Sequence, residues 1–447
     1  MTELEWLPAE IEDFLATKES TKREAADDFG HIIEAPPLGV LSPRSVTEIQ
    51  RLIAFAGPRG LPVAARGGAQ SVFGQGQAQG GIVVDMGPMN RVLAVHSDRA
   101  VVQAGATWND VLTAALPYRL APPVLTEDLS ATVGGVVCAG GIGGASHRYG
   151  LVADTVMEIE VVTGAGEHVT CSPRHEATLF HAVLAGLGRH GIIVRATVRL
   201  APAPERVRRY GLQYSDFASC LDDQRRLALE GRFCHLEGRV RPSVGGGWHH
   251  TAEVVAAHTG VRAPDDATLL DGLSHDPDAV QVTDLGYDEF LHRIDRQQRI
   301  LRVTREWLRP HPWLHLLLPD DTAQSIVTDI LSDPAFRDLR STGEVLLHPL
   351  SAERLRSPSL RRPPGPLVHL FGLRRTAPAD DPRAVERMVA ANKAAYERAR
   401  ALGAVVYPVS AMPMSAQDWR DHYGDHWRTL MDAKRRHDPH AILGKGL

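Results

Sequence analysis

The chain has 447 residues, 43% hydrophobic and 23% charged, a composition typical of a globular protein of two or three domains. Its formal net charge of −5 argues against a nucleic-acid or membrane partner. Four cysteines without Cys-x-x-Cys spacing exclude a disulfide framework, and the acidic N-terminus lacks a secretory signal, so a cytoplasmic protein is expected. No metal site is expected, because the 21 histidines lack zinc-type spacing.

The first half of the chain alternates short strands with helices. Residues 1–35 read as a short amphipathic helix and a linker. The pattern that follows predicts an α+β structure, because it lacks the strand, Gly-x-Gly-x-x-Gly and helix order of a doubly wound nucleotide-binding sheet. The predicted elements are a helix over 46–56, strands over 61–65, 82–86 and 101–104, a helix capped by Thr107, and a hairpin over 157–170.

The pattern changes after Pro202-Ala203-Pro204, which suggests a second domain. Strands predominate at first, and a charged helix is then predicted over 287–308, followed by an apolar strand over 314–318. A further helix is predicted over 384–402, ahead of the C-terminal tail.

A set of spaced glycine segments is the most informative feature of the sequence. The first ends a predicted strand at Arg66-Gly67-Gly68, where glycine lets backbone N–H groups approach a pyrophosphate closely. Thr132-Val133-Gly134-Gly135, Gly141-Ile142-Gly143-Gly144 and the strand that begins at Met157 follow in that order. A single glycine loop is a weak signal, but the ordered set indicates a flavin cradle.

In this order the segments resemble the PCMH-type FAD-binding domain of the vanillyl-alcohol-oxidase superfamily, and the chain is most similar to the cytokinin dehydrogenases. The resemblance extends through 184–193, His311-Pro312-Trp313-Leu314 and the tail from Trp419 to Leu443. It implies a two-domain α+β protein, with an FAD-binding domain over 36–203 and a substrate, or cap, domain over 204–404. Residues 405–447 are expected to return to the FAD-binding domain.

The resemblance also implies which residues contact FAD. Those of the glycine loop are expected to line the pyrophosphate through their backbone, and Gln75 matches a family glutamine near the flavin. Taken alone, Ile142 and Ile193 would be read as ordinary core residues. The full expected set is Ala65, Gly67, Gly68, Ala69, Gln70, Ser71, Gln75, Thr132, Gly135, Cys138, Ile142, Ile193, Tyr407 and Gly444.

A catalytic carboxylate is implied just before Thr132. In cytokinin dehydrogenases an aspartate there receives a proton from the substrate amine while hydride leaves the neighbouring carbon. An ungapped match puts Glu127 at this position, and glutamate supplies the same chemistry with one more methylene. Asp128, at the family's tyrosine position, is a rival base. By composition alone the two residues would be read as a solvated acidic pair.

A second departure from the family affects the cofactor linkage. Cytokinin dehydrogenases carry a histidine that bonds covalently to the flavin, whereas this loop reads Ala69-Gln70-Ser71, and an amide does not form that bond. FAD is therefore expected to be held non-covalently and to be a weaker oxidant. Cys138 is a conceivable thiolate anchor but is read as a buried structural thiol. The family's Ser-Pro-Gly-Gln is replaced by Gly444-Lys445-Gly446-Leu447, which removes one side-chain contact to the flavin.

Together these features predict an FAD-dependent oxidoreductase that removes hydride from a carbon next to an amine or hydroxyl of a small molecule. Oxygen or another acceptor would take the electrons. The two departures favour a divergent enzyme of specialised metabolism over one acting on N6-isoprenoid adenines. The alternatives are an alcohol or sugar oxidase of the same superfamily, and a non-catalytic protein that keeps the pocket for ligand binding. The sequence leaves the oligomeric state open.

Overall fold

The computed structural model describes residues 14–243, 245–259, 263–336, 339, 343–381 and 383–444. The beginning of the predicted N-terminal helix and linker, residues 1–13, and the last residues of the tail, 445–447, lie outside this part of the chain. The described part of the N-terminal segment forms β1 (Leu15–Ala16) and α2 (Glu19–Ala25). In this part of the chain no helix is both long and apolar enough to cross a membrane.

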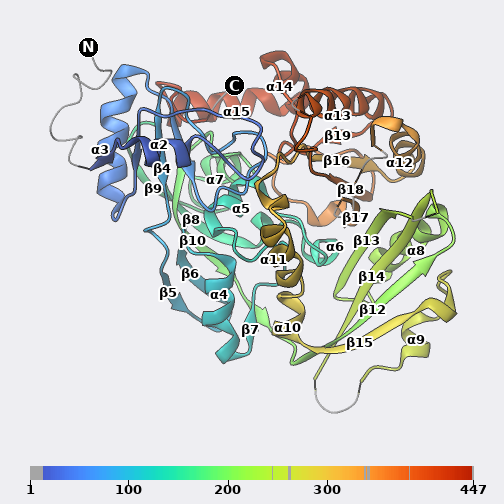
Figure 1. Ribbon diagram of the computed structural model, residues 1–447. Helices are drawn as coiled ribbons and strands as arrows, with labels where there is room; N and C mark the ends of the chain where they lie inside the picture. The colour runs from blue at the N-terminus through green and yellow to red at the C-terminus, as the bar shows by residue number, and fades with distance from the viewer. Residues whose placement is uncertain are drawn as a thin grey trace.

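The first sheet carries the glycine loop at the end of an edge strand. Its order is β1-β2-β4-β3, and β4 pairs in parallel with both β2 and β3. The predicted helix over 46–56 is present as α3, which is capped by Ser45 and lies at the left of Figure 1. The remaining bounds are β2 (Gly39–Leu41), α3 (Val46–Ala56), β3 (Val63–Arg66) and β4 (Ile82–Asp85).

A five-stranded antiparallel sheet completes the first half of the molecule. Its order is β5-β6-β10-β8-β9, and one hydrophobic core joins it to the first sheet. Thr107 caps α4 through a capping box with Asp110, as the sequence predicts. The elements are β5 (Val92–Val95), β6 (Arg99–Gln103), α4 (Trp108–Ala115), β7 (Leu120–Ala121), α5 (Val133–Ala139), α6 (Ser146–Tyr149), β8 (Val156–Val162), β9 (His168–Cys171), α7 (Ala177–Val183), β10 (Ile192–Arg199) and β11 (Ala201–Pro202), which pairs with β7.

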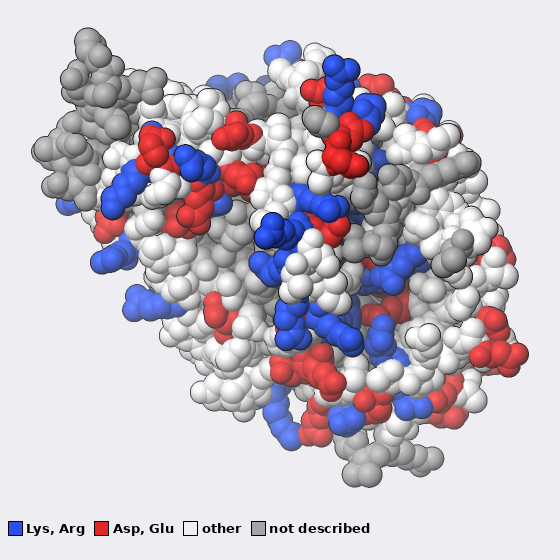
Figure 2. Space-filling model, in the orientation of Figure 1, with Lys and Arg blue, Asp and Glu red and all other residues white. Residues whose placement is uncertain are grey.

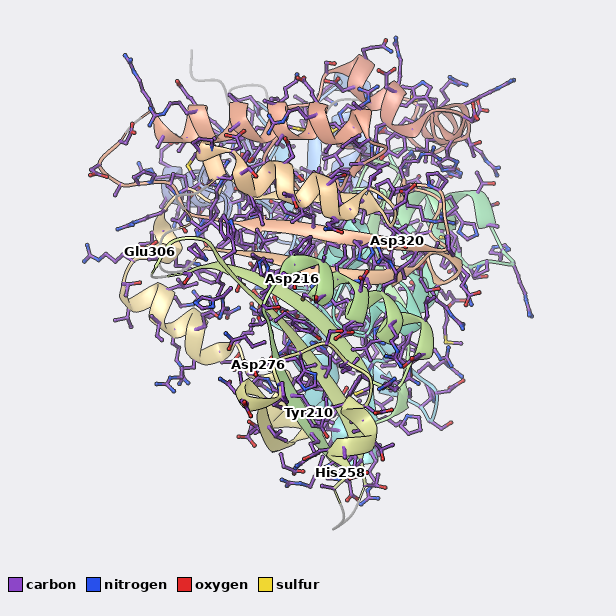
Figure 3. The ribbon with its side chains drawn as sticks, turned by 90° about the vertical axis from the view of Figure 1, so that its right-hand side faces the viewer. Tyr210, Asp216, His258, Asp276, Glu306 and Asp320 are labelled. Carbon is purple, nitrogen blue, oxygen red and sulfur yellow. The ribbon has the colours of Figure 1, made fainter. Side chains whose placement is uncertain are left out.

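The second half is built on an eight-stranded antiparallel sheet, at the right of Figure 1, in the order β15-β12-β14-β13-β17-β18-β16-β19. Figure 3 shows α8 in front of this sheet, with Asp216 at its N-terminal end and Asp320 just beyond β16. The strands are β12 (Arg206–Tyr214), β13 (His235–Pro242), β14 (Trp248–His258), β15 (Gln281–Gly286), β16 (Leu314–Pro319), β17 (Glu344–Ser351), β18 (Leu367–Arg374) and β19 (Val405–Val406). The helices are α8 (Phe217–Glu230), α9 (Asp266–Leu270), α12 (Ala323–Ser332) and α13 (Ala384–Ala401).

The alternation of side chains along β16 places this sheet between two cores. Leu316 and Leu318 pack in a core with buried residues of α8, α12 and α13, whereas Leu317 joins the core of the first half. Successive residues of a strand point to opposite faces, so the sheet holds helices on one side and faces the first half with the other. The molecule is thus a two-domain α+β protein, and the residue boundaries of its domains stay predictions.

The prediction of one long helix over 287–308 is wrong, because this segment forms two helices and a short 3₁₀ turn. These are α10 (Tyr287–Leu291), α11 (Asp295–Val303) and the turn Glu306–Leu308. At the break, His292 Nε2 lies 2.9 Å from Asn109 Oδ1, and Arg293 Nε donates to Glu253 Oε1 at 3.0 Å. Both side chains are therefore anchored away from the helix surface. Lysine and arginine side chains gather in the middle of Figure 2, the region that α11 occupies in Figure 1.

The C-terminal tail lies against the first half. It contains α14 (Ala416–Tyr423) and α15 (His426–His437), and α15 contacts α7. Beyond α15, Leu443 forms a parallel bridge with Val63, and Val63 N donates to Ile442 O at 2.8 Å. The tail thereby adds one more segment to the edge strand β3, which leads into the glycine loop.

Candidate active site

The glycine loop after β3 leaves its backbone amides unpaired. None of the N–H groups of residues 67–71 donates a hydrogen bond to another described residue. Ala69 takes the left-handed conformation with φ 53°, and a side chain at Gly67 would overlap Thr132 Oγ1. A concave run of unpaired amides favours an anion, so the loop fits the pyrophosphate of a dinucleotide cofactor.

Asp28, which the sequence left in the N-terminal segment, fixes the far end of this loop. Its carboxylate accepts hydrogen bonds from Ser71 Oγ at 2.8 Å, Gly74 N at 2.7 Å and Gly30 N at 3.1 Å. Burial raises the pKa of Asp28, while these three donors act in the opposite direction. The hydroxyl of Ser71 is therefore engaged, and its backbone N–H is the group left to face a cofactor.

Two glutamines connect the loop to distant parts of the chain. Gln70, at the position of the family's covalent histidine, donates from Nε2 to Ser130 Oγ at 3.5 Å. Gln75 Oε1 accepts from Phe73 N at 3.0 Å, and its Nε2 donates to Pro408 O at 3.4 Å. The loop is thus in contact with both the segment ahead of α5 and the segment after β19.

The N-terminus of α5 and the neighbouring strand β10 carry further residues expected to contact FAD, and we call this group the cofactor wall. Thr132 caps α5 by accepting from Gly135 N at 3.3 Å, and Ile193 is buried in β10. Cys138 and Ile142 are half-buried. Burial raises the pKa of Cys138 to about 12, so this thiol stays protonated near neutral pH and is a poor flavin anchor.

Tyr407 joins the second half of the chain to this wall. Its hydroxyl donates to Ala139 O at 2.6 Å and accepts from Gly141 N at 3.2 Å, and burial raises its pKa to about 12. Of the two remaining expected cofactor residues, Ala65 is half-buried in β3 and Gly444 lies beside β3 at the end of the tail.

Glu127 is clamped between two arginines of the eight-stranded sheet. Arg239 Nη2 and Arg374 Nη1 each donate to its carboxylate at 2.6 Å, Arg293 Nη2 lies 3.8 Å away, and the side chain is 8% exposed. Burial and the charge of Glu237 oppose ionisation. Arg374, Arg239 and Arg293 outweigh them and lower the pKa of Glu127 to about 2. Glu127 is therefore a permanent carboxylate at physiological pH.

Asp128, the rival base, turns back onto its own loop. Its Oδ1 accepts from Ser130 N at 2.9 Å and from Ser130 Oγ at 2.6 Å. Such local bonds are typical of an aspartate that shapes a turn. Between the two predicted carboxylates, Glu127 is the one that reaches the second half of the molecule.

The clamp belongs to a wider ionic network on the sheet. Arg239 also pairs with Glu237 and, at 3.0 Å, with Glu344, while Arg293 pairs with Glu253. Glu237 and Arg239 lie on β13, Glu253 on β14 and Glu344 on β17. Arg293 lies between α10 and α11. Buried charges persist when they are paired, and this pairing fixes the orientation of each arginine.

A row of side chains leads from Glu127 to the cofactor wall. Arg374 lies 5.3 Å from the Trp313 ring centroid, Trp313 6.0 Å from that of His315, and His315 6.4 Å from that of Tyr407. Burial and the charge of Arg374 lower the pKa of His315 to about 3, and its Nδ1 has no hydrogen-bond partner among the described residues. The row places the carboxylate and the cradle at one interface between the two halves.

Sequence reasoning missed Asp28, Arg239 and Arg374. Arg239 does carry a signal, because Glu237, Arg239 and Arg241 stand at alternate positions of one strand, and opposite charges on one strand face are buried only when they are paired. Asp28 carries none that we can identify. The structure shows no group of three or more His, Cys, Asp or Glu side chains placed to hold a metal ion within its described ranges.

The unpaired amides of residues 67–71 suit the pyrophosphate of a flavin dinucleotide, and the interface between the two halves also holds the carboxylate of Glu127. The chain matches the family model of the FAD binding domain over residues 37–172. The model described as cytokinin dehydrogenase 1, FAD and cytokinin binding, matches residues 256–447. The protein is an FAD-dependent oxidoreductase. More narrowly, it belongs to the cytokinin dehydrogenase family.

Relatives from bacteria and plants are similar over almost their whole length. The chain is 40% identical to an uncharacterized oxidoreductase, ORF5 in the fasciation locus, of Rhodococcoides fascians, over 94% of this chain and 95% of that protein. It is 34% identical to cytokinin dehydrogenase 6 of Oryza sativa subsp. japonica, over 97% and 90% of the two chains. Cytokinin dehydrogenase 2 of Arabidopsis thaliana is 30% identical, over 98% and 94%.

Proposed function

We propose that the protein removes hydride from a carbon next to an amine or hydroxyl group of a small molecule, with Glu127 as the hydrogen-bond and proton acceptor. FAD, when bound, supplies the hydride acceptor. The observation that supports this role is the position of Glu127, a buried and ionised carboxylate at the interface that also holds the cradle. The cytokinin-binding match favours a small-molecule substrate.

A carboxylate with a pKa of about 2 is a weak base, so its contribution depends on the substrate. An amine N–H or alcohol O–H becomes a strong acid as hydride leaves the adjacent carbon, and only then does Glu127 compete for the proton. Until that point, Arg239 and Arg374 hold the carboxylate in place as an acceptor that orients the substrate. Positioning of this kind is a large part of a catalytic group's effect.

FAD is proposed to be held non-covalently, with oxygen or another acceptor taking its electrons. Gln70 has no nucleophilic atom for the flavin, and the raised pKa of Cys138 argues against that thiol as an anchor. The substrate is proposed to differ from N6-isoprenoid adenines, in keeping with a role in specialised metabolism, because Glu127 is one methylene longer than the family's aspartate and its carboxylate is already bonded to Arg239 and Arg374.

The visible spectrum of the purified protein tests the cofactor. We expect a yellow protein that releases intact FAD when it is denatured by acid or heat. Flavin that stays with the precipitated chain would mean a covalent link at a residue other than Gln70. A colourless protein that FAD does not reconstitute would contradict the site as we have drawn it.

Anaerobic flavin reduction tests the chemistry. A panel of amines and alcohols that includes isopentenyladenine is mixed with the yellow protein, and bleaching of the flavin band is followed. We expect isopentenyladenine to react slowly. With a substrate that does bleach the flavin, Glu127→Gln should slow reduction roughly 10²-fold, and Asp128→Asn much less. The reverse order of the two variants would assign the base to Asp128.

A further inference from the structure

A cavity of about 420 Å³ lies between the two halves, and its lining contains Glu127 but none of the residues expected to hold FAD. Residues of β7, α6, α10 and the ends of β12 and β14 surround it, and β7 and α10 lie in the lower middle of Figure 1. Its volume falls in the range of small-molecule sites. It meets the candidate active site at Glu127, and Gly144 of the glycine segment 141–144 also lines it.

The walls of this cavity are mainly apolar and rigid. Phe290 and Leu125 contribute side chains, and four prolines fix the backbone around them. Rings that are already fixed lose little conformational entropy when a ligand binds, so such walls favour a flat apolar molecule. The four prolines are Pro122, Pro123, Pro202 and Pro204.

Three hydrogen-bond donors of the lining have no partner. The guanidinium of Arg148, an exposed residue, and the hydroxyls of the half-buried Tyr149 and Tyr287 make no hydrogen bond or ion pair with any described residue, and Arg148 lies 5.7 Å from the Tyr149 ring centroid. Burial raises the pKa of Tyr287, so its phenol stays a donor at neutral pH. Arginine has donors only, and a neutral phenol beside it donates as well.

The acidic and the other basic side chains of the lining already have partners. Glu127 is held by the arginine clamp, Arg293 pairs with Glu253 at 3.0 Å, and His258 Nε2 lies 3.0 Å from Asp284 Oδ2. Arg148 is therefore the one lining cation without an anionic partner among the described residues. A single guanidinium matches one negative charge, and its two parallel N–H donors suit the two oxygens of a carboxylate.

We propose that this cavity is a second small-molecule site that binds a flat, apolar monocarboxylate, with its carboxylate on Arg148, Tyr149 and Tyr287 and its ring against the prolines and Phe290. This site shares Glu127 with the candidate active site, but ligand binding at Arg148 does not depend on the proposed chemistry at Glu127. A ligand in this cavity would contact Glu127 from the side of α10. Binding of a second metabolite could therefore change the position of the Glu127 carboxylate.

Calorimetric titration of the FAD-loaded protein tests the site, with 1-naphthoate as the probe and the neutral 1-naphthamide as its control. We expect saturable binding of the acid and binding of the amide at least tenfold weaker. Arg148→Gln and Tyr287→Phe should each weaken the acid roughly tenfold and leave the amide unchanged. Arg174→Gln, which removes an exposed arginine outside the cavity, is the matched control and should change neither.

Unchanged FAD content and an unchanged thermal unfolding midpoint show that each variant is folded. Arg148→Gln and Tyr287→Phe test the site independently of each other. Equal affinity for acid and amide, or equal effects of Arg148→Gln and Arg174→Gln, would overturn the site. So would the absence of binding at millimolar probe. Tighter, Arg148-dependent binding of phenyl phosphate would overturn the assignment of a single negative charge.

Discussion

Replacing Arg374 by methionine tests whether the arginine clamp keeps Glu127 ionised. Methionine retains an apolar stem of similar length and removes the guanidinium that donates to Glu127 at 2.6 Å. Glu127 then remains a buried carboxylate with one hydrogen-bonded cationic partner, Arg239, and with Arg293 at 3.8 Å. We expect the folded protein to lose stability and the pKa of Glu127 to rise from its value of about 2.

The magnitude follows from the pKa of Glu127, which is about 2 in the folded protein against an ordinary value of 4.5. The difference is worth roughly 3 kcal/mol, at about 1.4 kcal/mol per unit. Because the folded pKa is lowered, this stabilisation is present above pH 4.5 and is lost as the pH falls toward 2. Three arginines share it, and Arg374 is 29% exposed, so its removal should cost about 1 kcal/mol at pH 7.

Urea unfolding at pH 7, followed by tryptophan fluorescence, measures this cost for the wild type, Arg374→Met, Glu127→Gln and the double variant. The double-mutant cycle should give a coupling of about 1 kcal/mol between the two residues. Arg387→Met removes a surface arginine that pairs with Asp381 and serves as the matched control, for which no change is expected. Strictly additive effects of the Arg374 and Glu127 substitutions would refute the clamp.

Three further substitutions test other parts of the site and the fold. Asp28→Asn removes the charge that accepts hydrogen bonds from Ser71 and Gly74, so FAD should bind roughly tenfold more weakly in a fluorescence titration of the apoprotein. Unchanged FAD affinity would mean that Asp28 does not support the cofactor loop. Cys138→Ser should release as much free FAD on denaturation as the wild type, because the thiol stays protonated. Burial lowers the pKa of His422 to about 3, so the imidazole takes up a proton on unfolding and the free energy of unfolding falls as the pH drops below 6.5. His422→Phe should lose about 2 kcal/mol less stability than the wild type between pH 7 and pH 5, measured by urea unfolding midpoints.

Local sequence signals predicted the architecture well where a short pattern determines the structure. Ser45 and Thr107 cap the helices that their spacing predicts, and the glycine loop follows a strand. The ordered glycine segments identified the FAD-binding fold, and the resemblance of 184–193, 311–314 and the tail identified the family, before any geometry was known. The predicted cofactor residues remain predictions, although residues 67–71 leave the unpaired amides that a pyrophosphate requires.

The clamp on Glu127 was beyond sequence reasoning because it depends on partners far along the chain. Arg239 is 112 residues away and Arg374 is 247 residues away, and no periodicity relates residues at such separations. The prediction of one helix over 287–308 failed for a related reason. His292 and Arg293 suit a helix locally, but their contacts with Asn109 and Glu253 override that preference.

The position of Leu443 beside Val63 has a consequence for biosynthesis. The backbone that flanks the edge strand β3 belongs to Ile442 and Leu443, whose N–H groups donate to Asp438 at 3.1 and 2.9 Å, and it is synthesised long after Val63. The strand that leads into the glycine loop therefore completes its hydrogen bonds only after the whole second half has been translated. A fragment that stops after the first half would lack that edge.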